Sequence, residues 1–458
     1  MNEQDWVRRS LASVWHPCTQ MQHHEQTPLI PLARAAGPWL YGQDGRRYLD
    51  GISSWWVNLF GHCNPRINAA IIGQLQQLEH AMLAGFTHEP VVELAERLSA
   101  LTGHALGHAF FASDGASAIE IALKMSFHSW RNAGQPEKNE YVCLRGSYHG
   151  ETVGALGVTD VALFRAAYGP LIRPAHIVSS PDARQARPGE NAAAVAARAL
   201  AEVATLFAER ASQIAAIIVE PLVQCASGMQ MYDASYLQGL RRLCDAHQVH
   251  LIADEIAVGC GRSGTFFACE QAGIWPDLLC LSKGISGGYL PLSLVLCRAA
   301  IYQAFYDADI RRGFLHSHSY TGNPLACRAA LATLDIFAQD QVLLRNRERA
   351  HKIMAGLQPL ARLPQVRHLR QCGMMFAFDV EAAFDGSASF ARRFFAAALE
   401  RELLLRPIGN TVYLMPPYVL NDAEIAHLCQ GTADSLQAVL QQALADPLTA
   451  AAAEEIVP

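Results

Sequence analysis

Two short segments place a lysine and a pair of carboxylates where chemistry is expected. Lys283 lies one residue after the short apolar run 278–281, and an amine at the end of a buried strand is removed from water. Its pKa then falls, and it can act as a nucleophile that forms a Schiff base. Asp254 and Glu255 follow the apolar run Val249–Ala253, at the edge where parallel strands bind ligands. A buried carboxylate there needs a cationic partner, either a protonated ring nitrogen or a loop arginine such as Arg262.

A third segment has the pattern of a phosphate-binding turn. Residues 113–117, Ser-Asp-Gly-Ala-Ser, lie between the apolar run His108–Ala112 and a stretch, 118–130, with apolar residues at helical spacing. Such a turn offers backbone N–H groups and a helix N-terminus to a phosphate, although by itself it is more typical of an ordinary helix N-cap. Together, the lysine, the strand-end carboxylate and this turn indicate pyridoxal 5′-phosphate (PLP).

Other chemical motifs lack the context that they need. Gly259–Gly264 fits G-x-G-x-x-G, but an aromatic segment follows it where a dinucleotide site requires a helix. Ser286 lies in a G-x-S-x-G pattern whose following glycines and proline oppose the helix of a nucleophile elbow. The histidines at 23–24 and at 316 and 318 have no carboxylate or thiolate at ligand spacing. We therefore expect no metal site.

The composition limits the class of protein. The chain has 458 residues and a net charge of −6, with 51% hydrophobic and 17% charged residues. These values exclude a disordered chain and argue against a nucleic-acid partner, which calls for a basic face. The twelve cysteines show no C-x-x-C spacing, which indicates a reducing compartment. Without a signal-peptide pattern or a run of about 20 apolar residues, we expect a cytoplasmic protein that does not enter a membrane.

The order of apolar runs predicts an α/β fold with two domains. Residues 26–50 have the pattern of antiparallel strands, and the five later runs are continuous and separated by helical segments, as in a parallel sheet buried on both faces. A long helical stretch is expected over Ala329–Leu357, followed by strands at Met374–Val380 and Thr411–Met415. We therefore predict a large domain over 65–330. Residues 1–64 and 331–458 form a smaller α+β domain. The five runs of the large domain are 108–112, 141–144, 214–219, 249–253 and 278–281.

Longer motifs resemble a known family. Ala253–Ile256 (ADEI), Gly261–Gly264 (GRSG), Lys283 at 29 residues after Asp254, and Tyr320–Ala326 (YTGNPLA) are similar to the class III PLP-dependent aminotransferases of fold type I. The resemblance implies a mostly parallel seven-stranded sheet and a homodimer with active sites at the interface. It narrows to one branch of the family through further motifs, WHP at 15–17, DGISSWW at 50–56, SYHG at 147–150, RP at 406–407 and YLMPPY at 413–418.

The resemblance also implies roles for residues around the cofactor. Lys283 matches the Schiff-base lysine, whose freed amine would move a proton, and Asp254 matches the residue that keeps the pyridine nitrogen protonated. Gly115 and Ala116 match phosphate-cradle positions, and Tyr148 matches the aromatic residue stacked on the ring. A stretch that contains Ser317, His318 and Ser319 would reach the cofactor phosphate from the partner subunit. Glu220 matches an acid near the site, without a clear role.

For the substrate, the resemblance implies a wall and a clamp. Trp55 matches the wall, while Arg406 matches a clamp for the carboxylate of a long acceptor, a task that suits guanidinium. Tyr148, Lys283 and Ser317 complete the expected substrate contacts. Trp55 and Trp56, adjacent on an extended chain, would point in opposite directions, so that only one faces the pocket. Cys18 stands where some family members carry a tyrosine that touches the substrate.

The expected activity is a ping-pong amino transfer. An amino donor, S-adenosylmethionine or lysine, would load the cofactor, and the amine would then pass to the keto group of a long, mostly apolar carboxylic acid. A second possibility is another class III ω-aminotransferase that uses a diamine or an amino acid. A third is a catalytically silent PLP-binding regulatory protein, although the sequence has neither a helix-turn-helix pattern nor a basic stripe.

Overall fold

The chain divides into two compact units. The computed structural model describes residues 3–25, 27, 29–381 and 390–445. The large unit comprises Pro65–Arg347 and Arg370–Met375; the small unit comprises Met1–Asn64, Glu348–Leu369 and Phe376–Pro458. The predicted boundary at residue 330 falls inside helix α11 (Pro324–Gln339).

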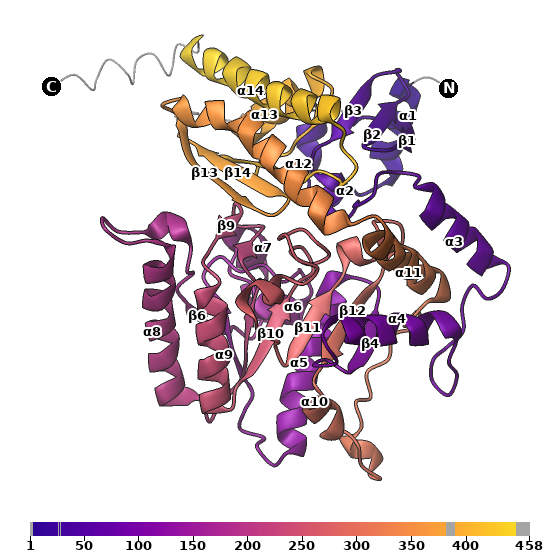
Figure 1. The fold of residues 1–458 in the computed structure, drawn as a ribbon, viewed down its shortest axis with the longest axis vertical. Coiled ribbons are helices and arrows are strands. Elements are labelled where there is room, and N and C mark those ends of the chain that lie inside the picture. The colour runs from indigo at the N-terminus through magenta and orange to yellow at the C-terminus, as the bar shows by residue number, and fades with distance from the viewer. Residues whose placement is uncertain (1–2, 26, 28, 382–389, 446–458) are drawn as a thin grey trace. The chain divides into compact units, whose positions relative to one another are not determined.

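The large unit is built on a seven-stranded sheet (Figure 1). Its strand order is β4-β12-β11-β10-β7-β5-β6, and β12 runs antiparallel to both of its neighbours while the other pairs are parallel. The predicted strands are confirmed, and β7, β11 and β12 are buried along their whole length because helices cover both faces. The strands are β4 (His108–Ala112), β5 (Glu140–Leu144), β6 (His176–Val178), β7 (Ile214–Val219), β10 (His250–Asp254), β11 (Leu278–Leu281) and β12 (Ser293–Cys297).

Helices bury apolar stripes against this sheet. Helix α5 (Gly115–Asn132) starts where predicted, and the Asp114 carboxylate caps it by accepting a hydrogen bond from the Ser117 N–H at 2.9 Å. Helices α8 (Ala192–Arg210) and α9 (Ser235–His247) lie side by side, as Figure 1 shows. The other helices of this unit are α3 (Pro65–Leu75), α4 (Glu89–Leu101), α6 (Val153–Gly157), α7 (Ala162–Arg165), α10 (Ala299–Gln303) and α11.

The helical stretch predicted over Ala329–Leu357 is confirmed, but it consists of two helices. Helix α11 ends at Gln339, and α12 spans Val342–Leu357. Between them, Gln341 has a left-handed backbone with φ of 50°. A residue in that region stops the right-handed helix, and the apolar periodicity on either side does not reveal the break.

The small unit contains the antiparallel strands expected near the N-terminus. Strands β1 (Leu32–Ala36), β2 (Trp39–Gly42) and β3 (Arg47–Asp50) pair antiparallel, and the short β15 (Leu403–Leu404) joins β3 in parallel. Both predicted C-terminal strands are confirmed as β14 (Met375–Val380) and β16 (Thr411–Leu414). The remaining elements are β13 (Val366–Cys372), α1 (Glu3–Ser13), α2 (Ser53–Trp56), α13 (Phe390–Glu400) and α14 (Asp422–Ala445).

The prediction of an extended chain at Trp55 and Trp56 is wrong. Ser53, Ser54, Trp55 and Trp56 all have positive φ, between 47° and 73°, and form one left-handed helical turn. The Trp56 N–H donates to the Ile52 carbonyl at 2.8 Å, as in a helical turn. The two indoles nonetheless separate, because Trp56 is 5% exposed and Trp55 is 47% exposed.

Two further observations concern the whole described chain. No helix within the described residues is both long enough and apolar enough to cross a membrane. All twelve cysteines are free thiols, and nine of them are buried.

Candidate active site

Lys283 lies at the end of β11, as expected. One residue, Ser282, separates it from the strand, and its backbone is left-handed with φ of 45°. Burial lowers the pKa of the Lys283 amine, and the nearby Cys225, Asp254 and Glu220 act in the opposite direction. A larger fraction of the amine is therefore unprotonated than in an exposed lysine, which favours nucleophilic attack on a carbonyl.

Asp254 lies at the end of the neighbouring strand β10, and its partner is a histidine. Its Oδ2 lies 2.7 Å from Nδ1 of His149, and its Oδ1 accepts the Ile256 N–H at 3.1 Å. Because a carboxylate oxygen accepts, the His149 Nδ1 is the donor of this bond. Among the described contacts of Asp254, Arg262 does not appear, so the alternative of an ion pair with that arginine is not supported. The carboxylate keeps acceptor capacity for a ring N–H.

His149 was not predicted as a site residue. It is 2% exposed, its N–H donates to Thr159 Oγ1 at 3.0 Å, and its Nε2 has no hydrogen-bond partner among the described residues. The available signal is its place beside Tyr148 in the SYHG motif. A single histidine in the sequence does not indicate which side chain it contacts in the folded chain.

Glu220 follows β7 and holds two neighbouring loops. Its carboxylate accepts the Tyr148 N–H at 3.1 Å and the Cys225 N–H at 3.0 Å. Burial raises the pKa of Glu220 to about 7. Glu220 thus fixes the backbone of Tyr148, whose hydroxyl donates to Glu151 Oε1 at 3.0 Å and whose ring lies 5.3 Å from that of Phe164.

Glu255 serves the loop that follows it. Its carboxylate accepts the N–H groups of Ala268 and Cys269, at 2.7 and 2.9 Å, and burial raises its pKa to about 7. Of the two strand-end carboxylates in the sequence, Asp254 is therefore the one that pairs with the His149 side chain near Lys283.

The phosphate turn meets two other loops at close range. A Cβ on Gly115 would lie 3.1 Å from the Ile256 side chain, and a Cβ on Gly150 would lie 2.6 Å from that of Ala116. Gly150 also has φ of 112°, which side chains rarely adopt. The predicted cradle, the SYHG loop and the segment after β10 are thereby brought to one place, as expected for strand ends of one sheet.

His318 lies beside the same turn in its own chain. Its Nε2 is 2.9 Å from Ser113 Oγ. Ser317 and Ser319 are exposed on either side of it. A contact of these residues with the cofactor of a partner subunit stays a prediction.

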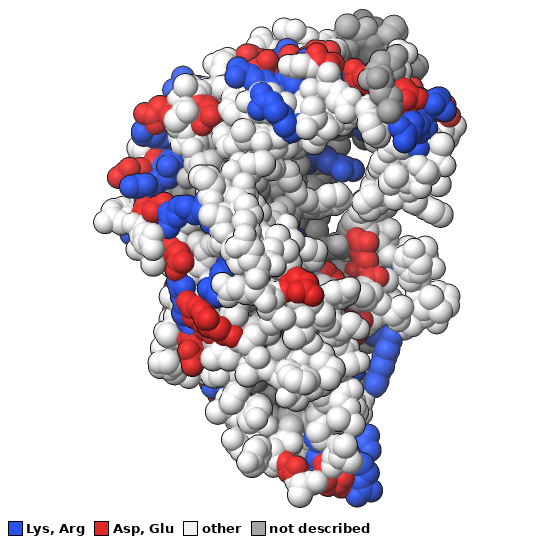
Figure 2. Space-filling model, turned by 90° about the vertical axis from the view of Figure 1, so that its right-hand side faces the viewer, with Lys and Arg blue, Asp and Glu red and all other residues white. Residues whose placement is uncertain are grey.

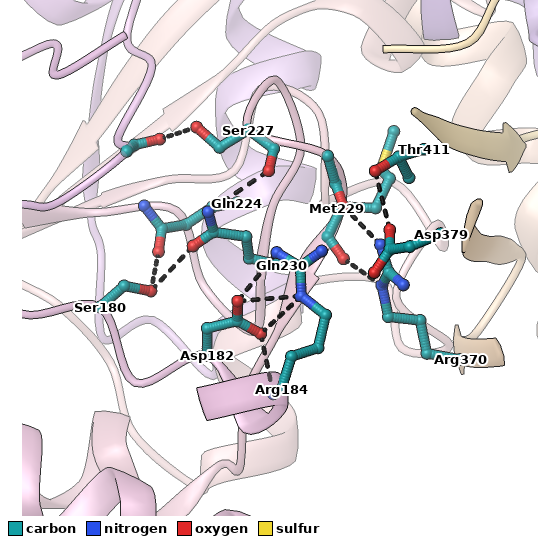
Figure 3. Close-up of polar contacts among 12 residues, drawn as sticks. Ser180, Asp182, Arg184, Gln224, Ser227, Met229, Gln230, Arg370, Asp379 and Thr411 are labelled. Atoms are coloured by element: carbon teal, nitrogen blue, oxygen red, sulfur yellow. Dashed lines mark hydrogen bonds and ion pairs between the residues drawn. The ribbon is translucent and has the colours of Figure 1, made fainter. Parts of the chain in front are cut away.

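Polar contacts hold a hairpin that follows Glu220 (Figure 3). Strands β8 (Val223–Gln224) and β9 (Gln230–Met231) pair antiparallel, and Ser180 donates to Gln224 at 2.5 Å and to Gln230 at 3.0 Å. Arg370 donates to the carbonyls of Gly228 and Met229 at 2.6 and 2.9 Å. These bonds fix the loop that carries Cys225, whose thiol pKa burial raises well above its usual range.

The predicted substrate residues Trp55 and Arg406 lie together in the small unit. The Arg406 guanidinium carbon lies 5.3 Å from the centre of the Trp55 ring, within cation–π range. Arg406 is exposed. Trp56 instead belongs to the core and donates from Nε1 to the Tyr413 hydroxyl at 3.1 Å. Cys18 is exposed.

The large-unit residues fit PLP. The chain offers an amine of lowered pKa, a carboxylate held by His149, and a glycine turn in which a side chain at 115 would press on Ile256. The amine matches the aldehyde of PLP, the carboxylate matches its pyridinium N–H, and the turn matches its phosphate. Among the described residues, no group of three or more His, Cys, Asp or Glu side chains is arranged to hold a metal ion.

Comparisons with known proteins agree with this geometry. The model of the family "Aminotransferase class-III" matches residues 20–436. Adenosylmethionine-8-amino-7-oxononanoate aminotransferase of Helicobacter pylori is 43% identical over 93% of this chain and 96% of its own length. The crystal structure of the enzyme of that name from Methanocaldococcus jannaschii is 31% identical, with a TM-score of 0.89 over 95% of this chain and 99% of its own. An omega transaminase of Pseudomonas jessenii, solved with PMP, is 25% identical with a TM-score of 0.90, covering 95% of this chain and 98% of its own.

Proposed function

Because the chain belongs to the class III aminotransferases, we propose that it aminates 8-amino-7-oxononanoate at its 7-keto group to give 7,8-diaminononanoate, a step of biotin synthesis. The observation that carries the proposal is the match over 93% of the chain to a relative named for this acceptor. The omega transaminase is as similar in fold but lower in identity, which makes the ω-aminotransferase reading the weaker alternative.

PLP is the cofactor of this family, and when bound it accepts the amino group and withdraws electrons from the carbon that loses a proton. We assign four roles to the large unit. Lys283 holds the cofactor and, once released, moves the proton as its unprotonated amine. Asp254 receives the ring N–H, and the turn 113–117 binds the phosphate through its N–H groups. The Tyr148 ring covers the cofactor, and Glu220 fixes that tyrosine through its backbone.

Arg406 and Trp55 are the proposed contacts of the acceptor. A guanidinium binds a carboxylate in a bidentate manner, and an indole covers an apolar chain. The exposure of both side chains leaves them available to a ligand. The donor that we propose is S-adenosylmethionine, on the name that the relatives share.

We also propose a cytoplasmic homodimer. The low charge, the free cysteines and several exposed apolar side chains on the large unit support this. Figure 2 shows a broad area of one face that carries few Lys, Arg, Asp or Glu side chains. Obligate interfaces are large and apolar in this way. The exposed side chains of the large unit include Ile72, Leu75, Met82, Phe86, Leu101, Tyr302, Tyr306, Ile310, Leu315 and Tyr320.

Complementation tests the function. A biotin auxotroph that lacks this aminotransferase should grow without biotin when it expresses the chain, and should fail to grow with Lys283→Ala at an equal protein level. Growth with Lys283→Ala would contradict the assigned chemistry. Absence of growth with the wild-type chain, although the purified protein binds PLP, would favour another acceptor.

A further inference from the structure

The segment that carries Trp55 has an unfavourable backbone. Four consecutive residues other than glycine, Ser53–Trp56, are left-handed. For each of them the Cβ crowds the backbone, which is why such residues occur singly and rarely as a helical turn. Strain of this kind persists only where the surroundings hold it, and it concentrates at functional sites.

One buried carboxylate holds this turn. Asp50, at the end of β3, is 0% exposed. Its Oδ1 accepts the Ser54 N–H at 2.8 Å, and its Oδ2 accepts the Ser54 hydroxyl at 2.7 Å. A further bond secures the start of the turn, because the Ser53 hydroxyl donates to the Met415 carbonyl at 2.7 Å.

A histidine completes the set of donors to Asp50. Nε2 of His62 lies 3.1 Å from Asp50 Oδ2, and its Nδ1 lies 3.1 Å from the Asn58 side-chain nitrogen. Because the Asn58 amide donates to Nδ1, the His62 proton is on Nε2 and points to the carboxylate. Three donors thus satisfy a buried carboxyl group, an arrangement whose disruption is costly.

Strand pairing sets the same carboxylate beside the segment of Arg406. In the parallel pair of β3 and β15, Asp50 is opposite Leu404, and the Gly51 N–H donates to the Leu404 carbonyl at 3.2 Å. A Cβ at Gly51 would lie 2.6 Å from the Leu405 side chain, so the two chains approach closely at this point. Trp55 and Arg406 therefore follow the ends of two adjacent strands, each a few residues beyond the paired residues Asp50 and Leu404.

We propose that Asp50 is a positioning residue for substrate recognition, which holds Trp55 in the left-handed turn so that its ring faces Arg406 and the two bind the acceptor as one surface. The inference rests on the proposed function, because it assigns the acceptor to that surface. Asp50 itself does not touch the reacting atoms. Its loss lets the turn relax, which moves the indole away from the guanidinium.

The first experiment compares Asp50→Ala with Asp50→Asn. With purified holoenzyme, Asp50→Ala should raise KM for 8-amino-7-oxononanoate by about tenfold or more, the effect of losing hydrogen bonds to a charged group. Asp50→Asn keeps an acceptor for the Ser54 N–H and should raise KM less. PLP affinity, read from the visible absorbance of the bound cofactor, should stay within about twofold for both, because Asp50 belongs to the other unit.

A double-mutant cycle separates positioning from mere structural support. Arg406→Ala alone should raise the same KM, and Asp50→Ala should add little in that background, because both act through one surface. Multiplicative effects on KM, or an Asp50→Ala protein with unchanged KM, would overturn the inference. A wild-type enzyme that binds PLP but does not aminate 8-amino-7-oxononanoate would overturn the proposed function and, with it, this inference.

A second pair of variants tests the turn itself. Ser54→Gly and Ser54→Ala both lose the hydroxyl bond to Asp50, but only glycine tolerates φ of 47° without a steric penalty. In an ordinary helix the alanine variant would be more stable. Here Ser54→Gly should melt about 2 °C or more above Ser54→Ala. A higher melting temperature for Ser54→Ala would contradict the left-handed turn on which the inference depends.

Discussion

The two regions that carry the proposed function are built in different ways. The cofactor residues of the large unit follow the ends of regular parallel strands, with Asp254 after a buried run of β10 and Lys283 just beyond β11. Trp55 of the small unit instead lies in a left-handed turn that a buried Asp50 holds. Charged groups such as Lys283 and Asp254 can thus be placed by the edge of an α/β sheet. The indole of Trp55 instead needs a local structure that holds it in one orientation.

The largest effect is expected at the lysine of the regular region. Lys283→Ala removes both the group that holds PLP and the proton carrier, so turnover should fall by about 10³-fold or more. The visible absorbance typical of PLP joined to a lysine should disappear. Turnover by stopped assay and an absorbance spectrum check both. An active variant with an unchanged spectrum would remove Lys283 from the site.

The close approach of loops at the phosphate turn gives the next effect. Gly150→Ala would place a Cβ 2.6 Å from that of Ala116, so PLP affinity should fall by about tenfold or more. Gly134→Ala is the matched control, because Gly134 also has positive φ but nothing lies within 4 Å of its Cβ. Titration of both apoproteins with PLP compares them. Equal affinity for the two variants would argue against a cradle at Ala116.

His149 should matter for the cofactor and not for the acceptor. His149→Leu removes the donor to Asp254, so PLP should bind about tenfold more weakly. His149→Asn retains an amide N–H near the Nδ1 position and should lose less. Neither should change KM for 8-amino-7-oxononanoate at saturating PLP as Asp50→Ala does. A shared effect of His149→Leu and Asp50→Ala on both quantities would mean that the two regions are not separable.

Two buried glutamates make the stability of the fold, rather than turnover, depend on pH. Burial raises the pKa values of Glu220 and Glu255 to about 7, above the usual value of about 4.3. The native state therefore binds more protons than the unfolded state between these values, and stability falls as the pH rises through that window. Each group contributes at most about 1.4 kcal/mol per pH unit. Glu255→Gln should flatten the decline between pH 5 and pH 7 in apoprotein denaturation, and an unaltered slope would count against this assignment.

The same contrast separates what the sequence predicts from what it does not. The strand-end lysine and aspartate are predictable, because a solid apolar run followed by a polar residue is typical of a buried strand that ends at a sheet edge. The pairing of His149 with Asp254 is not, because the two are 105 positions apart and no local pattern joins them. Serine and tryptophan do not predict a left-handed backbone, so the turn at Ser53–Trp56 cannot be foreseen from the sequence. Asp50 gives only a turn signal, because its three donors come together through the folded small unit.

Relative acceptor efficiency tests the central claim most directly. The purified holoenzyme, given S-adenosylmethionine, would be assayed for kcat/KM with 8-amino-7-oxononanoate and, in parallel, with pyruvate and 2-oxoglutarate. We expect 8-amino-7-oxononanoate to be preferred by about a hundredfold or more, since only this acceptor offers both a carboxylate to Arg406 and a long apolar chain to Trp55. A preference for pyruvate or 2-oxoglutarate would contradict the proposed function and would make the chain an aminotransferase of other acceptors.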